Sequence, residues 1–395
     1  MLNLASFVAG RPVAGPAALS VRHPYDGAEV GRVITASRAD TEAAVQAALA
    51  AGPAPSRWEG ARLLARARRA RGAGRGESSR LITAGGGPAR GEPRHEVTRT
   101  LDVLRFAAME TLRDDGQAFA GDISPLGKAR RIFTCREPLR CAAAITPFNH
   151  PLNQVAHKVA PAFAAGTPLV LKPSEKTPLV ALQFAELLYA AGLPPAMLSV
   201  LLGPTAEVAE VLVRHPEVEL VAFTGSVAVG RRIAATAGYR RLVLELGGNA
   251  PLIALDDAAP ALAVPPAAEG SFRNSGQRCT AVKRLLVQDG LLPEFTRRLV
   301  EKTAEYVCGD PADEATRVGT VIDEASAIYL ETVVNEAVAA GARVLTGGVR
   351  RGAQYPPTVI AVVPRDARMV TCESFGPLAP ILPVRDLNDA LALAN

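Results

Sequence analysis

The sequence is poor in the residues and spacings that mark several classes of protein. Its 395 residues include one tryptophan, four methionines and five cysteines. No two cysteines have CxxC spacing, and their odd number argues against a disulfide framework. The five histidines have no metal-ligand spacing, so we expect no metal site.

Long apolar runs are also missing. Stretches such as residues 159–171 are broken by proline and glycine and are shorter than the roughly 20 residues that a membrane span needs. The N-terminal segment MLNLASFVAGRPVAG has no basic region followed by a sustained apolar core. We therefore expect a cytoplasmic protein with no membrane partner.

Basic residues are in slight excess, with a net charge of +5. The excess is concentrated between Arg62 and Arg99, and no nucleic-acid-binding motif or aromatic-interleaved basic stretch accompanies it. We therefore expect no nucleic-acid partner. Internal repeats are absent.

The length predicts two or more subdomains. From about residue 141 onward, short β-rich runs alternate with helical patterns, which indicates an α/β fold with a parallel sheet flanked by helices. Ligands bind such sheets at the carboxyl ends of the strands. The expected strands are 141–146, 167–171, 198–202, 220–223 and 241–246, and the expected helices are 177–191, 205–214 and 229–237.

Two segments look irregular. Residues 72–91 are rich in glycine, proline and arginine, and glycine costs about 1 kcal/mol and proline about 3 kcal/mol in a helix interior. We therefore expect no long regular helix there. Residues 386–395 have the pattern of an amphipathic helix that stops after its first turns.

A candidate base follows one of the expected strands. Glu245-Leu246-Gly247-Gly248-Asn249 places a glutamate before two glycines, which permit close backbone approach. The simplest interpretation is a turn with a solvated charge. In a cleft, however, the pKa of a glutamate can rise enough for it to act as a base near neutral pH.

A candidate nucleophile ends the run Asn274-Ser275-Gly276-Gln277-Arg278-Cys279. A lone cysteine is most often a small buried apolar residue. This one follows a polar loop and a basic residue, surroundings that lower the pKa of a thiol. A thiolate can attack an aldehyde to form a thiohemiacetal, which expels hydride and leaves a thioester for an activated water.

Two further motifs stand at strand ends. In Pro147-Phe148-Asn149-His150-Pro151 the asparagine is typical of a turn, but its amide N–H and the backbone N–H of Cys279 are suited to hold an oxyanion. The run from Phe223 to Gly230 is a strand–turn–helix junction. Its GSxxxG pattern is weak alone, yet a helix N-terminus and the Ser226 hydroxyl offer donors to a phosphate.

Taken in order, these motifs resemble the aldehyde dehydrogenase superfamily. The resemblance covers residues 101–395 and, more loosely, the N-terminal hundred residues. Six motifs in register make an accidental match untenable. They are Asn149, Lys172/Glu175, Gly225/Gly230, Glu245, Cys279 and Glu373-Ser374-Phe375-Gly376-Pro377.

The resemblance implies an α/β fold with a Rossmann-like NAD-binding domain and an α/β catalytic domain of the aldehyde dehydrogenase fold, C-terminally truncated. Residues 1–120 and 140–247 would form the NAD-binding domain, with 72–91 irregular, 121–139 a bridging and oligomerisation segment, and 248–395 an incomplete catalytic domain. The family implies a homodimer or homotetramer, impaired if the C-terminus is truly absent. A truncated, inactive remnant is therefore the alternative to an active enzyme.

The resemblance also implies residue roles. Cys279 would be the nucleophile, Glu245 the base that activates water, and Asn149 the oxyanion donor. A carboxylate at Glu175 accepts hydrogen bonds from ribose hydroxyls and repels a 2′-phosphate, which favours NAD over NADP. The implied cofactor residues are Lys172 and Glu175 for the adenosine ribose, Gly225, Ser226 and Gly230 for the pyrophosphate, and Glu373 and Phe375 for the nicotinamide ribose and ring.

Basic residues suggest an anionic substrate. Arg99, His150 and Arg278 match residues that hold the phosphonate in phosphonoacetaldehyde and phosphonoformaldehyde dehydrogenases, which the runs RIFTCREP and SGQRCTAVKR also resemble. Arginine offers bidentate contacts to such groups. Arg99 could equally be an exposed helix residue in an arginine-rich sequence. The resemblance implies oxidation of a phosphono-aldehyde in phosphonate catabolism or antibiotic biosynthesis; a lactaldehyde or semialdehyde dehydrogenase is the alternative.

Overall fold

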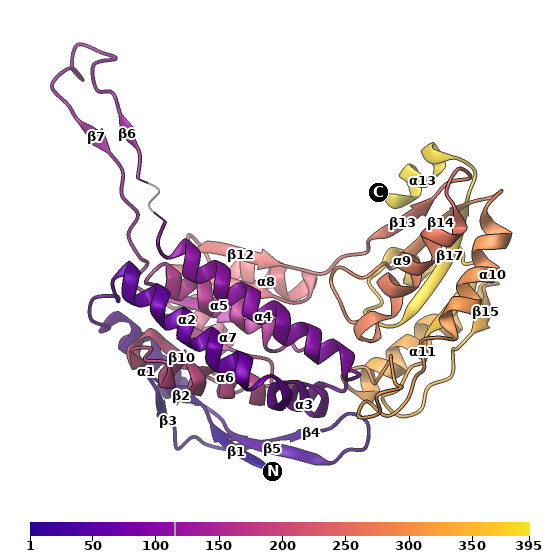
Figure 1. Cartoon of the computed structure of the whole chain (residues 1–395), viewed down its shortest axis with the longest axis horizontal. Coiled ribbons are helices and arrows are strands. Elements are labelled where there is room, and N and C mark those ends of the chain that lie inside the picture. The colour runs from indigo at the N-terminus through magenta and orange to yellow at the C-terminus, as the bar shows by residue number, and fades with distance from the viewer. Residues whose placement is uncertain (114–115) are drawn as a thin grey trace.

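The computed structural model describes residues 1–113 and 116–395, which form two lobes (Figure 1). The N-terminal lobe is drawn in indigo to pink and the C-terminal lobe in orange to yellow, and the chain crosses between them at residues 246–250. Within the described residues, no helix combines the length and apolar character of a membrane span.

A seven-stranded sheet forms the centre of the N-terminal lobe. Its order is β12-β11-β8-β9-β10-β2-β3; the first five strands pair in parallel, whereas the β10–β2 and β2–β3 pairings are antiparallel. The five parallel strands are those predicted from the sequence, which confirms the α/β class. The bounds are β2 Phe7–Val8, β3 Arg11–Pro12, β8 Ala142–Ile145, β9 Leu169–Lys172, β10 Leu198–Val200, β11 Leu220–Thr224 and β12 Arg241–Glu245.

Helices cover both faces of this sheet. One apolar layer contains side chains of α2, α4, α5 and α6, and the opposite layer contains side chains of α1, α7 and α8. The helices are α1 Arg38–Leu49, α2 Arg57–Ala73, α3 Arg75–Gly86, α4 Gly91–Glu110, α5 Asn153–Ala164, α6 Leu179–Ala190, the 3-10 turn Pro195–Met197, α7 Ala209–Arg214 and α8 Val227–Thr236.

The prediction of an irregular segment at residues 72–91 is wrong for Arg75–Gly86, which form α3. Tertiary burial outweighs the low helix propensity, because Leu81 and Ile82 pack into the apolar layer. Arg71 also contributes, since its guanidinium is buried, donates to the Ser78 hydroxyl and lies over the Phe184 ring. Gly87, in the left-handed conformation, then ends the helix.

Two smaller sheets complete this lobe. A three-stranded sheet has the order β1-β5-β4, and a hairpin of two short strands projects from the lobe (Figure 1). The hairpin leaves Phe119, Ile123, Leu126 and Phe133 exposed. The bounds are β1 Leu2–Ala5, β4 Ala18–Arg22, β5 Glu29–Ile34, β6 Ala118–Phe119 and β7 Ile132–Phe133.

The C-terminal lobe contains a five-stranded sheet of order β13-β14-β17-β16-β15, parallel except for β15. The amphipathic helix predicted at residues 386–395 forms as α13, and Arg284 donates to its last carbonyls, those of Leu393 and Ala394. The bounds are β13 Pro251–Ala254, α9 Pro260–Phe272, the 3-10 turn Arg273–Gly276, β14 Arg284–Gln288, α10 Leu292–Thr303, α11 Glu324–Ala339, β15 Arg343–Thr346, β16 Thr358–Ala361, α12 Arg368–Thr371, β17 Leu378–Val384 and α13 Leu387–Ala394.

Candidate active site

Cys279 is half-buried at the end of a strained loop. Asn274, Ser275 and Gly276 all have positive φ, at 52°, 53° and 69°. The left-handed conformation costs a non-glycine residue roughly 1–2 kcal/mol, and it persists only where the surroundings impose it. Here the Gln277 side chain accepts a hydrogen bond from the Ile322 N–H at 2.9 Å. Backbone strain of this kind is typical of functional sites.

Asn149 binds the loop that carries Cys279. Its side-chain nitrogen donates to the Gln277 carbonyl at 2.8 Å, and its own carbonyl accepts from the Asn274 side chain at 3.0 Å. These two hydrogen bonds anchor the segment after β8 to the Cys279 loop. One of them ends on Gln277, two residues before Cys279. A side-chain amide has two N–H groups, and the second one on Asn149 has no acceptor among the described residues, so it can donate to a ligand.

Glu96 holds the same segment from α4, and the sequence reasoning missed it. It is 4 % exposed, and its Oε1 accepts from the backbone N–H groups of Leu152 and Asn153 at 2.7 and 2.9 Å. Its Oε2 lies 3.8 Å from Nδ1 of His150. The available signal was that α5 begins without a side-chain cap of its own, so its first N–H groups need a distant acceptor.

Glu245 ends β12 and is followed by two glycines at a close approach of three segments. A Cβ on Gly247 would overlap the Glu373 carboxylate, and one on Gly248 would lie 2.9 Å from the Cys279 carbonyl. The Glu245 charge also reaches α5, where burial lowers the pKa of Lys158 and Glu245 opposes that shift. The structure therefore places the Glu245 motif against both the Cys279 loop and Glu373.

Glu373 and Phe375 complete this junction. Glu373 Oε1 accepts from the Gly248 N–H at 3.4 Å. The Phe375 ring meets Phe148, the neighbour of Asn149, edge-on with centroids 5.9 Å apart. The Asn149, Glu245 and Glu373 motifs, which are distant from one another in the sequence, thus converge around the Cys279 loop.

The remaining cofactor candidates lie at the carboxyl edge of the seven-stranded sheet. Lys172 ends β9, is buried, and donates to Glu175 at 2.6 Å. The Ser226 hydroxyl accepts from the Val229 N–H at 3.3 Å at the start of α8. Gly225 is required by close approach, because a Cβ there would lie 2.5 Å from the Phe223 ring.

Two buried hydroxyls at this edge, those of Thr146 and Thr224, have no hydrogen-bond partner among the described residues. Polar groups of this kind, beside a helix N-terminus, fit a phosphate-containing ligand such as a dinucleotide. Gly230 has a different reason to be glycine. It is buried inside α8, and a Cβ there would overlap the Leu246 side chain, so it allows close packing of α8 on the segment after β12.

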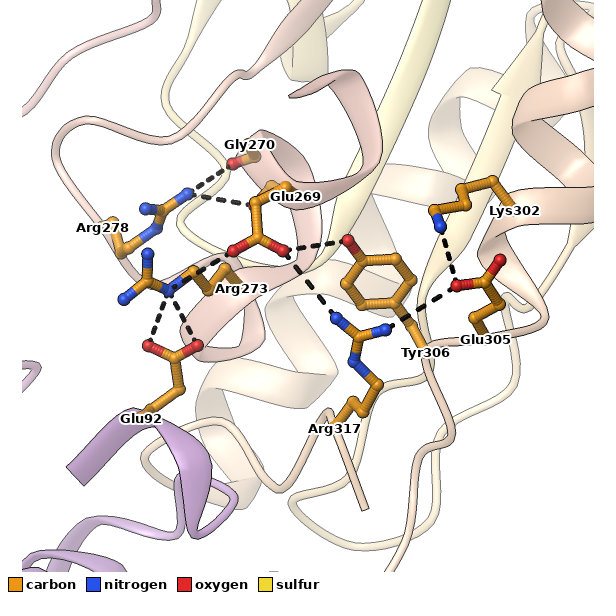
Figure 2. A network of polar contacts seen from close by, with 9 residues as sticks. All are labelled: Glu92, Glu269, Gly270, Arg273, Arg278, Lys302, Glu305, Tyr306 and Arg317. Carbon is orange, nitrogen blue, oxygen red and sulfur yellow. Dashed lines mark hydrogen bonds and ion pairs between the residues drawn. The ribbon is translucent and has the colours of Figure 1, made fainter. Parts of the chain in front are cut away.

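The three candidate substrate residues differ in their surroundings. Arg278 donates through Nη2 to the carbonyls of Glu269 and Gly270 at 3.2 and 2.9 Å, whereas its buried Nε has no partner among the described residues (Figure 2). His150 is half-buried beside Glu96. Arg99 is exposed on α4 and lines a cavity of about 1130 Å³ whose lining includes Lys158 but none of Cys279, His150 and Arg278.

A polar network links the Cys279 loop to both lobes (Figure 2). Arg273 donates through Nε to both carboxylate oxygens of Glu92 on α4, at 2.9 and 3.0 Å, and lies 3.7 Å from Glu269. Glu269 in turn accepts from the Tyr306 hydroxyl at 3.0 Å. The network therefore fixes the loop between α4 and α9.

A half-buried thiol on a strained loop, together with a helix N-terminus and two buried hydroxyls without a partner among the described residues at the carboxyl edge of a parallel sheet, defines a class of α/β protein with a cysteine site and a dinucleotide-type binding edge. The comparisons specify this class. A model of the aldehyde dehydrogenase family matches residues 13–395, and the chain belongs to this family. The predicted superfamily and fold class are confirmed.

The similar proteins include the 3-sulfolactaldehyde dehydrogenase of Priestia aryabhattai, 40% identical over 304 residues, which are 77% of this chain and 64% of the relative. The chain thus spans less than two thirds of that relative. The succinate-semialdehyde dehydrogenase (NADP+) of Escherichia coli is 34% identical over 390 residues, 96% of this chain and 79% of the relative. The crystal structure of aldehyde dehydrogenase 21 from Physcomitrella patens with the reaction product succinate has a TM-score of 0.95 at 34% identity, covering 100% of this chain and 83% of that one.

Proposed function

We propose that the chain oxidises an aldehyde to a carboxylic acid with NAD, through a covalent intermediate on Cys279. The observation that carries this proposal is the convergence of the Cys279 loop with Asn149, with the Gly247-Gly248 junction after Glu245, and with Glu373. The lobe of residues 1–120 and 140–247 would bind NAD, residues 121–139 would bridge subunits, and residues 248–395 would supply the nucleophile.

The residues divide the reaction into two halves. The Cys279 thiolate adds to the aldehyde carbon, and the oxygen that becomes negative accepts hydrogen bonds from the free N–H of Asn149 and the backbone N–H of Cys279. The chemistry that bound NAD supplies is acceptance of a hydride from the carbon attached to Cys279, which leaves a thioester. Glu245 then takes a proton from the attacking water, the C–S bond breaks, and Cys279 leaves as a thiolate.

Lys172, Glu175, Ser226, Glu373 and Phe375 would hold the cofactor. Glu175 favours NAD, because its carboxylate accepts from the ribose hydroxyls and repels a 2′-phosphate. A solved relative supports this choice, since the betaine aldehyde dehydrogenase of Staphylococcus aureus, at 30% identity, TM-score 0.94, and covering 99% of this chain and 80% of that one, was crystallised with NAD+. The E. coli relative, by its name, uses NADP. Comparing kcat/KM with NAD and with NADP distinguishes between the two cofactors.

The substrate we propose is an aldehyde with an anionic group, first of all a phosphono-aldehyde. The buried Nε of Arg278 has no partner among the described residues, and an anionic group would supply the acceptor it needs. His150 directly follows Asn149, the proposed oxyanion donor, so it would lie near the same substrate. The names of the relatives support the anionic class, because sulfolactaldehyde carries a sulfonate and succinate semialdehyde a carboxylate. A sulfonate is tetrahedral like a phosphonate, so sulfonates are the nearest rival.

The experiment is NADH formation by purified chain with phosphonoacetaldehyde, phosphonoformaldehyde, sulfolactaldehyde, succinate semialdehyde and propanal. We expect the highest kcat/KM with a phosphono-aldehyde. A higher value with sulfolactaldehyde or succinate semialdehyde would overturn the phosphonate preference and keep the anionic class. Comparable turnover of propanal would overturn the anionic class.

We also propose a homo-oligomer, a dimer or tetramer. The projecting β6–β7 hairpin exposes Phe119, Ile123, Leu126 and Phe133, and an apolar group of this kind marks a protein-contact surface. Light scattering should give two or four times the mass of the chain, and replacing Ile123 and Leu126 with Asp should lower it. A monomer at micromolar concentration would contradict the proposal.

A further inference from the structure

Lys283 is a buried charge for which the proposed reaction has no role. It follows Cys279 by four residues, directly before β14, and is 2 % exposed. Removing an ammonium group from water is unfavourable unless it is well paired. A side chain of this type at the centre of the site therefore needs an explanation.

The contacts of Lys283 join two of the site's segments. Its Nζ donates to the Gly276 carbonyl at 3.1 Å, within the loop that carries Cys279. The same atom lies 4.0 Å from Oε1 of Glu373 and 5.1 Å from the centroid of the Phe375 ring, a cation–π distance. The two segments approach closely at the same place, because a Cβ on Gly276 would overlap the Gly376 carbonyl.

Three charged or titratable groups face this ammonium. Burial lowers the pKa of Lys283 to about 8, the negative charge of Glu373 opposes that shift, Arg278 adds to it, and Cys279 opposes it. The opposing influence of Glu373 agrees with the 4.0 Å between Lys283 Nζ and Glu373 Oε1.

We propose that Lys283, as an ammonium ion, is a positioning residue that holds the Glu373–Phe375 segment against the Cys279 loop. The inference rests on the proposed function, in which these two segments position the nicotinamide and supply the nucleophile. Through Glu373 and Phe375, Lys283 sets the place of the ring that faces the carbon bound to Cys279.

The two roles predict different melting temperatures for a variant without Lys283. A purely structural tether predicts a lower melting temperature, whereas a positioning role predicts no loss. Because the pKa of Lys283 is lower in the folded chain than its ordinary value of 10.5, the unfolded chain binds more protons between about pH 8 and pH 10.5, and stability rises with pH across that window. Below pH 8 the charge opposes folding. Replacing it with methionine, of similar length, should therefore leave the melting temperature unchanged or raise it.

The test compares Lys283→Met with wild type and with Lys302→Met, which removes a lysine on α10 that pairs with Glu305. The readouts are kcat, the KM for NAD, the melting temperature, and the dissociation constant of NAD measured by calorimetry without aldehyde. For Lys283→Met we expect kcat/KM for NAD to fall by about tenfold to a hundredfold, NAD binding to weaken, and stability to be kept. The Lys302 variant should match wild type.

A lower melting temperature with unchanged kinetics and NAD binding would overturn the proposal in favour of a structural tether. Unchanged kinetics and NAD binding at unchanged stability would overturn it as well. NAD binding needs no turnover, so it separates two failures. If wild type binds NAD but does not oxidise aldehydes, the proposed function fails, whereas weaker NAD binding by Lys283→Met still supports the positioning of the Glu373–Phe375 segment by Lys283.

Discussion

Glu92 and Glu96 lie one turn apart on α4 and hold two different loops of the site. Glu92 accepts both hydrogen bonds from Arg273, at the start of the Cys279 loop. Glu96 accepts from the N–H groups that follow the Asn149 segment. One helix of the N-terminal lobe therefore fixes the distance between the proposed oxyanion donor and the proposed nucleophile.

Glu96 should matter for both stability and turnover. Glu96→Ala leaves the N–H groups of Leu152 and Asn153 without their acceptor, which costs about 1–3 kcal/mol for each buried unpaired group. Urea unfolding should show this loss, and kcat should fall because the Asn149 segment is no longer held. Glu96→Gln keeps an acceptor oxygen and should recover most of both. If Glu96→Ala unfolds and turns over like wild type, the capping role is wrong.

Gly247 should be needed for cofactor use rather than for folding. The Cβ of Gly247→Ala would overlap the Glu373 carboxylate, which is the end of a flexible side chain and can move away. We expect the KM for NAD to rise with little change in melting temperature. Gly52→Ala is the control, since a Cβ there meets nothing within 4 Å. An unchanged KM would show that Glu373 does not contact the cofactor.

Glu175 should determine the choice of cofactor. In Glu175→Gln the side chain no longer repels a 2′-phosphate, so the ratio of kcat/KM for NADP to that for NAD should rise by about tenfold, equivalent to roughly 1.4 kcal/mol. Glu186→Gln, which changes an exposed carboxylate on α6, serves as the control. A ratio that stays the same in both variants contradicts the assignment of Glu175.

The five cysteines should differ in reactivity. Burial raises the pKa of Cys141 to about 12 and that of Cys308 to about 11, so both remain protonated thiols at pH 8. Mass spectrometry after iodoacetamide treatment at pH 8 should show these two unmodified in folded protein and modified after denaturation. Cys135 and Cys372 are exposed and should react first. Early modification of Cys141 would contradict its burial.

Much of this site follows from local patterns. Short apolar runs ending in polar residues predict the parallel strands, and Asn149, Lys172 and Glu245 then fall at or just after the strand ends because that edge is shared. The uncapped start of α5 indicates only that a distant acceptor is needed. It does not identify Glu96, since the N–H groups that Glu96 binds are 56 and 57 residues away in the sequence and become its partners only when α4 and α5 pack together.

The errors have the same origin. Helix propensity argued against α3, but burial of Leu81 and Ile82 outweighs a few unfavourable glycines. The sequence also gave no indication that Arg278 donates to two carbonyls of α9, so its free Nε is what remains for a substrate. Contacts that form only in the folded chain decided each of these points.

The central claim is that this chain oxidises an aldehyde through Cys279, and NADH formation tests it most directly. Wild type and Cys279→Ala should be compared with NAD and the same set of aldehydes, after both have been shown to be soluble and monodisperse. The account predicts NADH formation by wild type, fastest with a phosphono-aldehyde, and none by Cys279→Ala. No NADH from well-folded wild type with any of these aldehydes, or equal rates for the two proteins, would contradict it.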